Sequence, residues 1–414
     1  MVTHHLCLLR PTTHTLPLAL RPRAPHSRPP TVAPHHHRPA HLHLRPLHAT
    51  AAAAGGGGSP GGADGGKSPS ATSSPLGAAL VGFARSNFLP LALITGMTLG
   101  LVDPTLGCLA HKYSLSKYST FGIFLISGLT LRTKELGAAL EAWPAGLFGL
   151  ASILLFTPFL AQFIMQIKFF PHEFITGLAM FCCMPTTLSS GVTLTQLVGG
   201  NTALALAMTV ISNLLGIVTV PLSLAKYIGA GAGVSLPTEQ LFKSLVTTLL
   251  IPIIVGKVAR ETSKGIAGFV DGNKQGFAVT SAILLSLVPW MQVSRSRSLL
   301  LSVQPKAFAV AVTVGVLLHF ALLVFNAVAL HILSQLEQRE SVFARNEYAR
   351  AVILVASQKT LPVLVAVVEQ LRGALGESGL LVIPCVAAHI NQIIIDSIVV
   401  NWWRQRDQQF ANAK

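Results

Sequence analysis

A run of polar residues interrupts the long apolar segment 349–371. Gln358, Lys359 and Thr360 lie there, just ahead of Pro362. Ionisable residues inside a membrane span are rare and mark ion or substrate pathways. A helix ending at such a break leaves carbonyl groups that hold cations, and one beginning there leaves N–H groups that hold anions. We therefore predict that these three residues bind an ion or a substrate; the alternative is a lysine that snorkels to the membrane surface.

A second interruption lies in the apolar segment 174–198 and carries hydroxyl groups in place of charges. Proline removes a backbone donor and clashes with the preceding turn, so the helix is expected to break near Pro185. In lipid, non-helical backbone must be buried in protein or line a wet cavity. Hydroxyls coordinate a monovalent cation or a substrate oxygen, although they also serve in ordinary helix packing. The predicted binding residues of this break are Pro185, Thr187, Ser189 and Ser190.

Two carboxylates in apolar segments are weaker candidates. Asp396 precedes the Trp-Trp-Arg run 402–404, which is typical of a membrane interface, so we expect Asp396 near that interface. Glu369 has Arg372 three residues further on, and this i,i+3 spacing favours an ordinary surface ion pair.

The composition indicates which elements must position these residues. Only 11% of the 414 residues are charged, whereas soluble domains carry about 25%, and the mean hydropathy is +0.59. We predict an all-α polytopic membrane protein with about ten transmembrane helices. Its broken helices 4 and 9 cross, and each is fourth in a group of five, as two inverted five-helix repeats require. The predicted spans are 88–102, 118–131, 143–167, 174–198, 202–228, 241–259, 277–293, 307–333, 349–371 and 379–403.

Charges and motifs exclude several function classes. The predicted loops carry thirteen Lys and Arg on the side of the N-terminus and nine on the other, which places both termini inside. The net charge of +15 does not indicate nucleic-acid binding, because no basic stripe is interleaved with aromatic residues. No HExxH, GxSxG or P-loop motif is present, so we expect neither an enzyme nor direct use of ATP. The five cysteines form no CxxC pair and are expected to pack as small apolar residues.

Residues 1–75 have a different composition from the rest of the chain. No Asp or Glu precedes Asp64, and the first 50 residues hold six arginines and ten of the 15 histidines. This composition is typical of an organelle transit peptide, and its length favours the chloroplast. The alternative is a disordered basic tail that binds anionic lipid or nucleic acid. We expect a transit peptide and linker over 1–75 and a membrane transporter domain over 76–414.

Three stretches resemble signatures of the bile acid:sodium symporter family. They are Ser127-Gly128-Leu129-Thr130-Leu131, the stretch from Met184-Pro185 to Ser190-Gly191-Val192, and the stretch from Gly200-Asn201 to Met208-Thr209. The similarity covers roughly 85–405 and is to a divergent, plastid branch of the family. It implies a sodium-coupled secondary transporter of a small organic anion in the chloroplast envelope, at the inner membrane. It implies no cofactor other than the coupling sodium, and it implies the small organic anion and the lipid bilayer as partners.

The family's sodium ligands carry over to this chain only in part. The resemblance implies candidate sodium ligands at Ser190, Thr209 and Gln358, but it aligns the other ligand positions with Gly191, Ala205 and Leu354, and a third-helix glutamine with Ile153.

At the second sodium site, Leu354 occupies the position of the family's glutamate. Lys359, nearby, brings a positive charge to the same site. The ammonium is expected either to replace the second sodium or to carry a proton, and transport to depend at most weakly on sodium. Two other functions remain open: a membrane regulator of ion homeostasis, calcium for example, that does not transport, and an ion pathway.

Overall fold

The computed structural model describes residues 88–132, 142–188, 190–336, 343 and 345–412. The predicted leader, 1–75, and the predicted site residue Ser189 lie outside these ranges.

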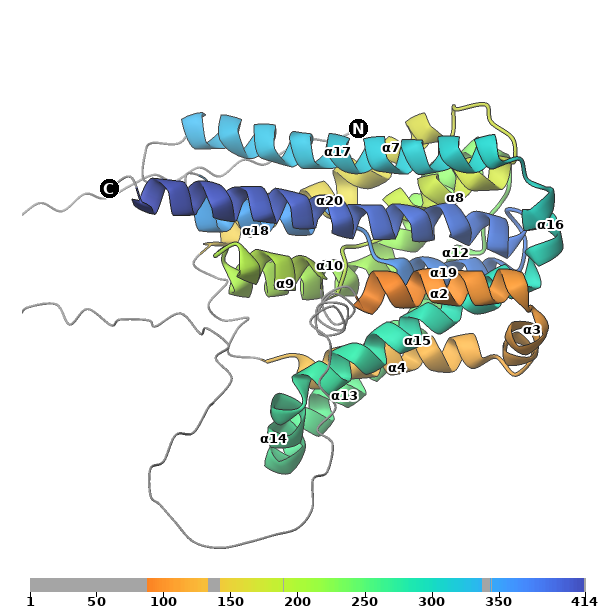
Figure 1. The fold of residues 1–414 in the computed structure, drawn as a ribbon, viewed down its shortest axis with the longest axis horizontal. Helices are drawn as coiled ribbons and strands as arrows, with labels where there is room; N and C mark the ends of the chain where they lie inside the picture. Colours follow the sequence, from red (N-terminus) through yellow and green to blue (C-terminus); the bar gives the residue numbers. More distant parts are fainter. Residues whose placement is uncertain (1–87, 133–141, 189, 337–342, 344, 413–414) are drawn as a thin grey trace, which may run out of the picture. The chain divides into compact units, whose positions relative to one another are not determined.

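The described residues fold into helices, with no strand among them (Figure 1). Helices coincide with all ten predicted spans. They are α2 (Phe88–Val102), α4 (Leu115–Thr130), α6–η2–α7 (Trp143–Ala151, Ser152–Phe156, Thr157–Ile164), α8 and α9 (His172–Cys182, Ser190–Leu197), α10–η3–α11 (Thr202–Ser223, Leu224–Gly229, Ala230–Ala232), α12–η4–α13 (Thr238–Leu245, Val246–Leu250, Ile251–Thr262), α15 (Lys274–Arg295), α17 (Pro305–Leu336), α18 and α19 (Asn346–Ser357, Leu361–Leu371) and α20 (Ser378–Asn412). Short helices α3 (Thr105–Lys112), α14 (Lys264–Gly272) and α16 (Arg297–Ser302) connect them.

Seven helical segments of the described chain are long and apolar enough to cross a membrane, or eight if α2 and α3, bent by 103°, form one span. The chain is therefore an all-α polytopic membrane protein, while the count of ten spans and the inverted repeat stay predictions. The exposed face of the long helix α17 is suited to contact with lipid. α17 exposes large apolar side chains at helical spacing along one face, namely Leu317, Phe320, Val324, Val328 and Ile332.

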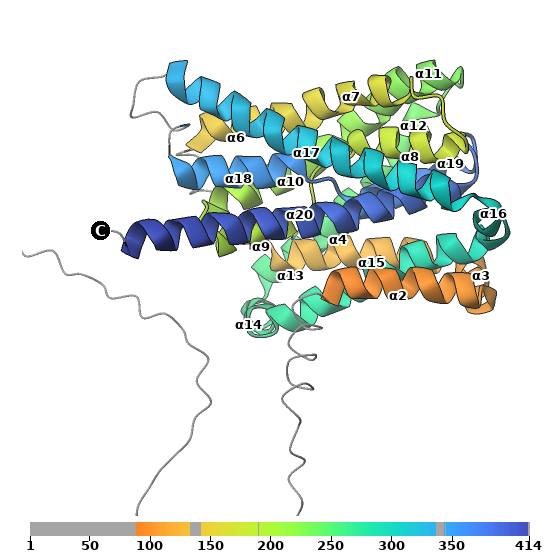
Figure 2. The same cartoon turned by 45° about the horizontal axis from the view of Figure 1, so that its top comes forward.

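Helices α2, α4, α13 and α15 pack against one another on one side of the bundle (Figures 1 and 2). Glycines bring α4 and α13 into backbone contact. A Cβ atom added at Gly128 would lie 2.2 Å from the carbonyl oxygen of Ile253, and one at Gly256 would lie 2.3 Å from that of Leu125. Small residues are the usual means by which membrane helices approach this closely.

The substitution Gly128→Ala is expected to destabilise the protein by about 1–3 kcal/mol, because the added methyl group forces α4 and α13 apart. The control is Gly268→Ala in α14, where a new Cβ meets nothing within 4 Å of it. Alanine in a helix should leave stability unchanged or raise it there. Thermal unfolding of the purified variants measures both effects, and equal midpoints for the two would contradict the close contact.

At the end of this helix group, an ion-pair cluster holds α14 in place. Asp271 accepts hydrogen bonds from Arg132 and from Arg260, whose Nη2 lies 2.8 Å from Asp271 Oδ2. The hydrogen bond from Arg132 lowers the pKa of the Asp271 carboxyl, and Arg260 acts in the same direction.

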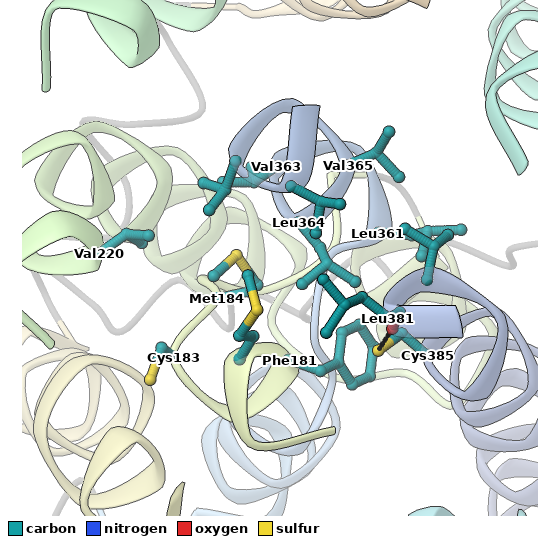
Figure 3. Packing of buried hydrophobic residues seen from close by; sticks show 14 of the residues in the cluster. Phe181, Cys183, Met184, Val220, Leu361, Val363, Leu364, Val365, Leu381 and Cys385 are labelled. Atoms are coloured by element: carbon teal, nitrogen blue, oxygen red, sulfur yellow. Dashed lines mark hydrogen bonds between the residues drawn. The ribbon is translucent and has the colours of Figure 1, made fainter. Parts of the chain in front are cut away.

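Helix α19 is buried along almost its whole length, and it packs against α8, α12 and α20 as well as against α4 and α15. Its apolar side chains join a core with residues of α8, α10 and α20. Figure 3 shows Leu361 and Leu364 of α19 near Phe181 and Met184 of the first broken segment. A helix that is apolar on all sides belongs in an interior. The cysteines of this core, Cys182, Cys183 and Cys385, are buried free thiols, as predicted, whereas Cys108 of α3 is exposed.

Both predicted helix breaks are confirmed. Helix α8 ends at Cys182 and α9 begins at Ser190, with Pro185 between them. Helix α18 ends at Ser357, the backbone is extended at Gln358 and Thr360, and α19 begins at Leu361. Pro362 lies in the first turn of α19, where its missing N–H group would be unpaired in any case.

Candidate ion- and substrate-binding site at the two helix breaks

The two breaks meet each other in the interior of the protein. The backbone N–H group of Thr360 donates to the carbonyl of Pro185 at 2.9 Å. The Thr186 hydroxyl donates to the carbonyl of Val355, and Asn213 of α10 donates to the carbonyl of Thr186 at 3.1 Å. The backbone groups released by the broken helices therefore bond across the junction, as buried polar groups in lipid require.

Gln358 connects the hydroxyl groups of one break with a carboxylate on α20. Its Oε1 accepts from Thr187 Oγ1 at 2.5 Å and from Ser190 Oγ at 2.8 Å. Its Nε2 donates to Asp396 Oδ2 at 2.6 Å. Gln358 is fully buried. Three of the predicted site residues, Thr187, Ser190 and Gln358, are thus brought together with their oxygens adjacent.

The expectation that Asp396 lies near the membrane interface is wrong. Its side chain is fully buried within the bundle. Besides Gln358 it contacts His319 of α17, whose Nε2 lies 2.8 Å from Asp396 Oδ1. The other ring nitrogen of His319 lies 3.3 Å from the carbonyl oxygen of Ser357. Both nitrogens of His319 thus face acceptor oxygens.

Sequence reasoning missed His319 altogether. The only signal was a histidine near the middle of the apolar span 307–333, which also contains His331 near its end, and unperturbed histidine is neutral over most of the physiological range. A buried histidine beside a buried carboxylate is a functional candidate, since such pairs are costly to place in a membrane protein.

Lys359 is buried to 1% exposure, so its side chain does not snorkel to a membrane surface. Its ammonium group donates to the carbonyl oxygen of Ile153 at 3.1 Å. Ile153 lies in η2, a π-helical turn, and such turns often occur at functional sites. The structure therefore brings the lysine of the ninth predicted span to the third predicted span.

The backbone of Lys359 is held by one glutamine. Gln392 Oε1 accepts from the Lys359 N–H group at 3.0 Å, and Gln392 Nε2 donates to the Lys359 carbonyl at 2.8 Å. His389 Nδ1 also lies 3.2 Å from that carbonyl oxygen. The extended backbone at the second break is thus satisfied by side chains of α20, which sequence reasoning did not identify.

The structure places the remaining predicted residues apart from this cluster or in other roles. Thr209 is buried on α10, and its hydroxyl donates to Ala205 of its own helix at 2.8 Å. Thr360 and Pro185 contribute backbone groups to the junction. The predicted pair of Glu369 and Arg372 is wrong: Glu369 accepts from Ser116 and from Gln292, the latter at 3.1 Å.

The adjacent oxygens of Thr187, Ser190 and Gln358 are neutral hard donors, of the kind that hold sodium at unwound helices. Within the described ranges no group of three or more His, Cys, Asp or Glu side chains could hold a metal ion. A cation at this site would therefore be held by hydroxyl, amide and carbonyl oxygens, with Asp396 supplying the negative charge one bond away.

Comparisons with known proteins match this chain to transporters. The model of the SBF-like CPA transporter family matches residues 87–405. Over their full lengths, the chain is 87% identical to a protein of Oryza sativa subsp. indica named "Probable sodium/metabolite cotransporter BASS4, chloroplastic". It is 63% identical to the protein of that name from Arabidopsis thaliana over 83% of this chain and 79% of the relative. Half of the chain is 29% identical to 63% of "Sodium/bile acid cotransporter 7" of Danio rerio.

Proposed function

The chain belongs to the SBF-like CPA transporter family and is a secondary transporter, and we propose that it carries a small organic anion across the inner membrane of the chloroplast envelope. The names of its plant relatives support a metabolite as the transported molecule and the chloroplast as the compartment, and the apolar helices support a multi-pass membrane protein. The protein is a carrier and not an enzyme.

The contacts of Lys359 bear on how transport is coupled to ions. The relatives are named as sodium cotransporters, which supports sodium as the coupling ion. However, the ammonium of Lys359 donates to Ile153, a position that the family resemblance assigns to the second sodium site. Leu354, at that site's carboxylate position, is fully buried. A buried ammonium would repel a sodium ion at this place, since unit charges interact strongly in a low-dielectric interior.

In the proposed mechanism, Lys359 takes the place of the second sodium, and any remaining sodium binds near Thr187, Ser190 and Gln358. Sodium then has at most a weak effect on transport. The second coupling candidate is proton exchange by Lys359; the neighbouring Gln358 contacts Asp396, which in turn contacts His319. A series of uptake measurements over pH separates the two.

A non-transporting regulator of ion homeostasis is the alternative function. The observation that favours it is the loss of side-chain ligands at Gly191, Ala205 and Leu354, which leaves the carrier fold with an incomplete ion site. An ion pathway that moves no metabolite is the third candidate.

One assay distinguishes these functions. The purified protein is reconstituted in liposomes, and uptake of a panel of labelled organic acids is measured beside the flux of sodium, potassium and calcium. Saturable uptake of an acid supports the proposed carrier. Ion flux without acid uptake supports an ion pathway. The absence of both activities supports a regulator.

The predicted leader can be tested independently of transport. A fusion of residues 1–80 to a soluble reporter is expected to enter plastids and to be shortened there, because the segment is basic and nearly free of acidic residues. Fluorescence microscopy and immunoblotting of leaf cells give the result. A reporter that stays in the cytosol or is secreted would show that the leader is a basic tail with another role.

A further inference from the structure

A cavity of about 340 Å³ lies between the C-terminal end of α19 and helices α3, α4 and α15. None of the helix-break residues lines it. The lining contains three permanently basic side chains, Lys117, Arg295 and Arg372, and one carboxylate, Glu369, so that these formal charges sum to +2 (three minus one). Glu377 lies 3.7 Å from Arg295 and offsets part of this charge. The cavity thus favours an anion.

Buried polar atoms in the cavity wall have no partner among the described residues. They are Gln292 Oε1, Ser378 Oγ and His111 Nδ1. Gln292 is fully buried, and its Nε2 already donates to Glu369, so its free oxygen requires a donor. Unpaired buried polar atoms are rare and destabilising in native proteins, and a ligand that pairs with them is favoured.

Two residues of the wall adopt a strained backbone. Ser114 has a φ of 56° and Arg372 a φ of 49°, and within the described chain these are the residues other than glycine with positive φ. Arg372 caps the end of α19 in this left-handed conformation, where glycine or asparagine is usual. Such strain is typical of binding sites, where the side chain is needed at that place.

We propose that this cavity binds a small carboxylic acid that also carries a hydroxyl group. The carboxylate pairs with the basic side chains, as charge-assisted hydrogen bonds favour, and the hydroxyl donates to Gln292 Oε1. The volume is near the lower end of the roughly 300–1,000 Å³ of ligand pockets, which suits a small metabolite. The inference rests on the proposed carrier function and names the class of its substrate.

The test uses the purified full chain in nanodiscs, with malate and succinate as probes. The two dicarboxylates have equal charge and differ by one hydroxyl group. Binding measured by thermal shift and by calorimetry is expected to be at least about tenfold tighter for malate, because a site built to pair a hydroxyl discriminates against its absence. Gln292→Met, of similar size, should remove this preference.

The variant Arg372→Gly separates binding from folding. Glycine adopts positive φ without strain, so the unliganded variant should unfold at the same temperature as the wild type or higher. Its affinity for malate should fall at least about tenfold with loss of the charged pair. Arg404→Gln, a change of an exposed arginine that does not line the cavity, is the control and should bind malate as the wild type does.

A malate preference below twofold, or wild-type affinity in Arg372→Gly, would overturn the proposal, as would stabilisation by phosphatidylglycerol vesicles and not by malate. The failure of transport is distinguishable from the failure of this site. If Arg372→Gly loses malate binding while the wild type takes up no acid, the carrier function alone is refuted. Uptake with an unchanged KM in Arg372→Gly would refute the cavity alone.

Discussion

Uptake of the organic anion into proteoliposomes is expected to be abolished in Lys359→Ala and in Lys359→Met, although both variants fold. The amino group of Lys359 is buried at the junction of the two breaks and donates to the carbonyl of Ile153, and neither replacement supplies such a group. Burying an ionised group is costly, so its removal offsets part of the packing lost. Methionine also keeps most of the volume, and volume-conserving changes usually cost less than about 1.5 kcal/mol.

The measurement is uptake with sodium or potassium outside, repeated over a pH series, together with thermal unfolding to confirm folding. Wild-type uptake should change little when potassium replaces sodium. Strong sodium dependence with a Hill slope near two would mean that two sodium ions bind, and that Lys359 does not occupy a cation position. A steep pH dependence of wild-type uptake that is the same in sodium and in potassium would identify the lysine as a proton carrier.

The second large effect is expected for Asp396→Ala, which should destabilise the protein by about 3–5 kcal/mol and remove transport. The substitution leaves the Gln358 amide and His319 without their shared acceptor in a fully buried place. Asp396→Asn keeps the shape and an acceptor oxygen. It should recover most of the stability and little of the transport, if the negative charge is what the site needs.

A matched control lies on the same helix. Asp407 forms an exposed ion pair with Arg350, and Asp407→Asn should change stability by less than about 1 kcal/mol, as surface pairs do. A double-mutant cycle of Asp396→Ala with His319→Ala measures the coupling of the buried pair. Additive effects of the two changes would contradict a direct interaction between them.

The helix breaks were predictable because proline and clustered polar residues act locally on the backbone. The contacts of the side chains were harder to predict. Asp396 was misplaced because the Trp-Trp-Arg run was interpreted as the end of a span, whereas α20 continues to Asn412 and Asp396 lies near its middle. Glu369 was paired with Arg372 from helical spacing, but α19 ends at Leu371 and the left-handed Arg372 no longer follows that spacing.

Other site residues could not be found from one sequence. Gln392 contributes through the backbone of Lys359, and this role leaves no mark in residue type. Ile153 was aligned with a ligand position by the family resemblance, but its contribution through a main-chain carbonyl cannot be read from its side chain. Thr187 and Ser190 were correctly grouped with Gln358 from the matched positions of the breaks. Their common partner on α20 depends on which helix packs across them, and this is a property of the fold as a whole.

The backbone hydrogen bond between Thr360 and Pro185 holds the two breaks together independently of the side chains that would bind ions. This bond is made by main-chain atoms, so it is available whatever side chains surround it. Carboxylates, hydroxyls or an ammonium can be exchanged around the crossing while the helices stay joined. A carrier built in this way can change its driving ion through a few substitutions, with no need for a new scaffold. The same property makes the junction a suitable place for engineering ion selectivity.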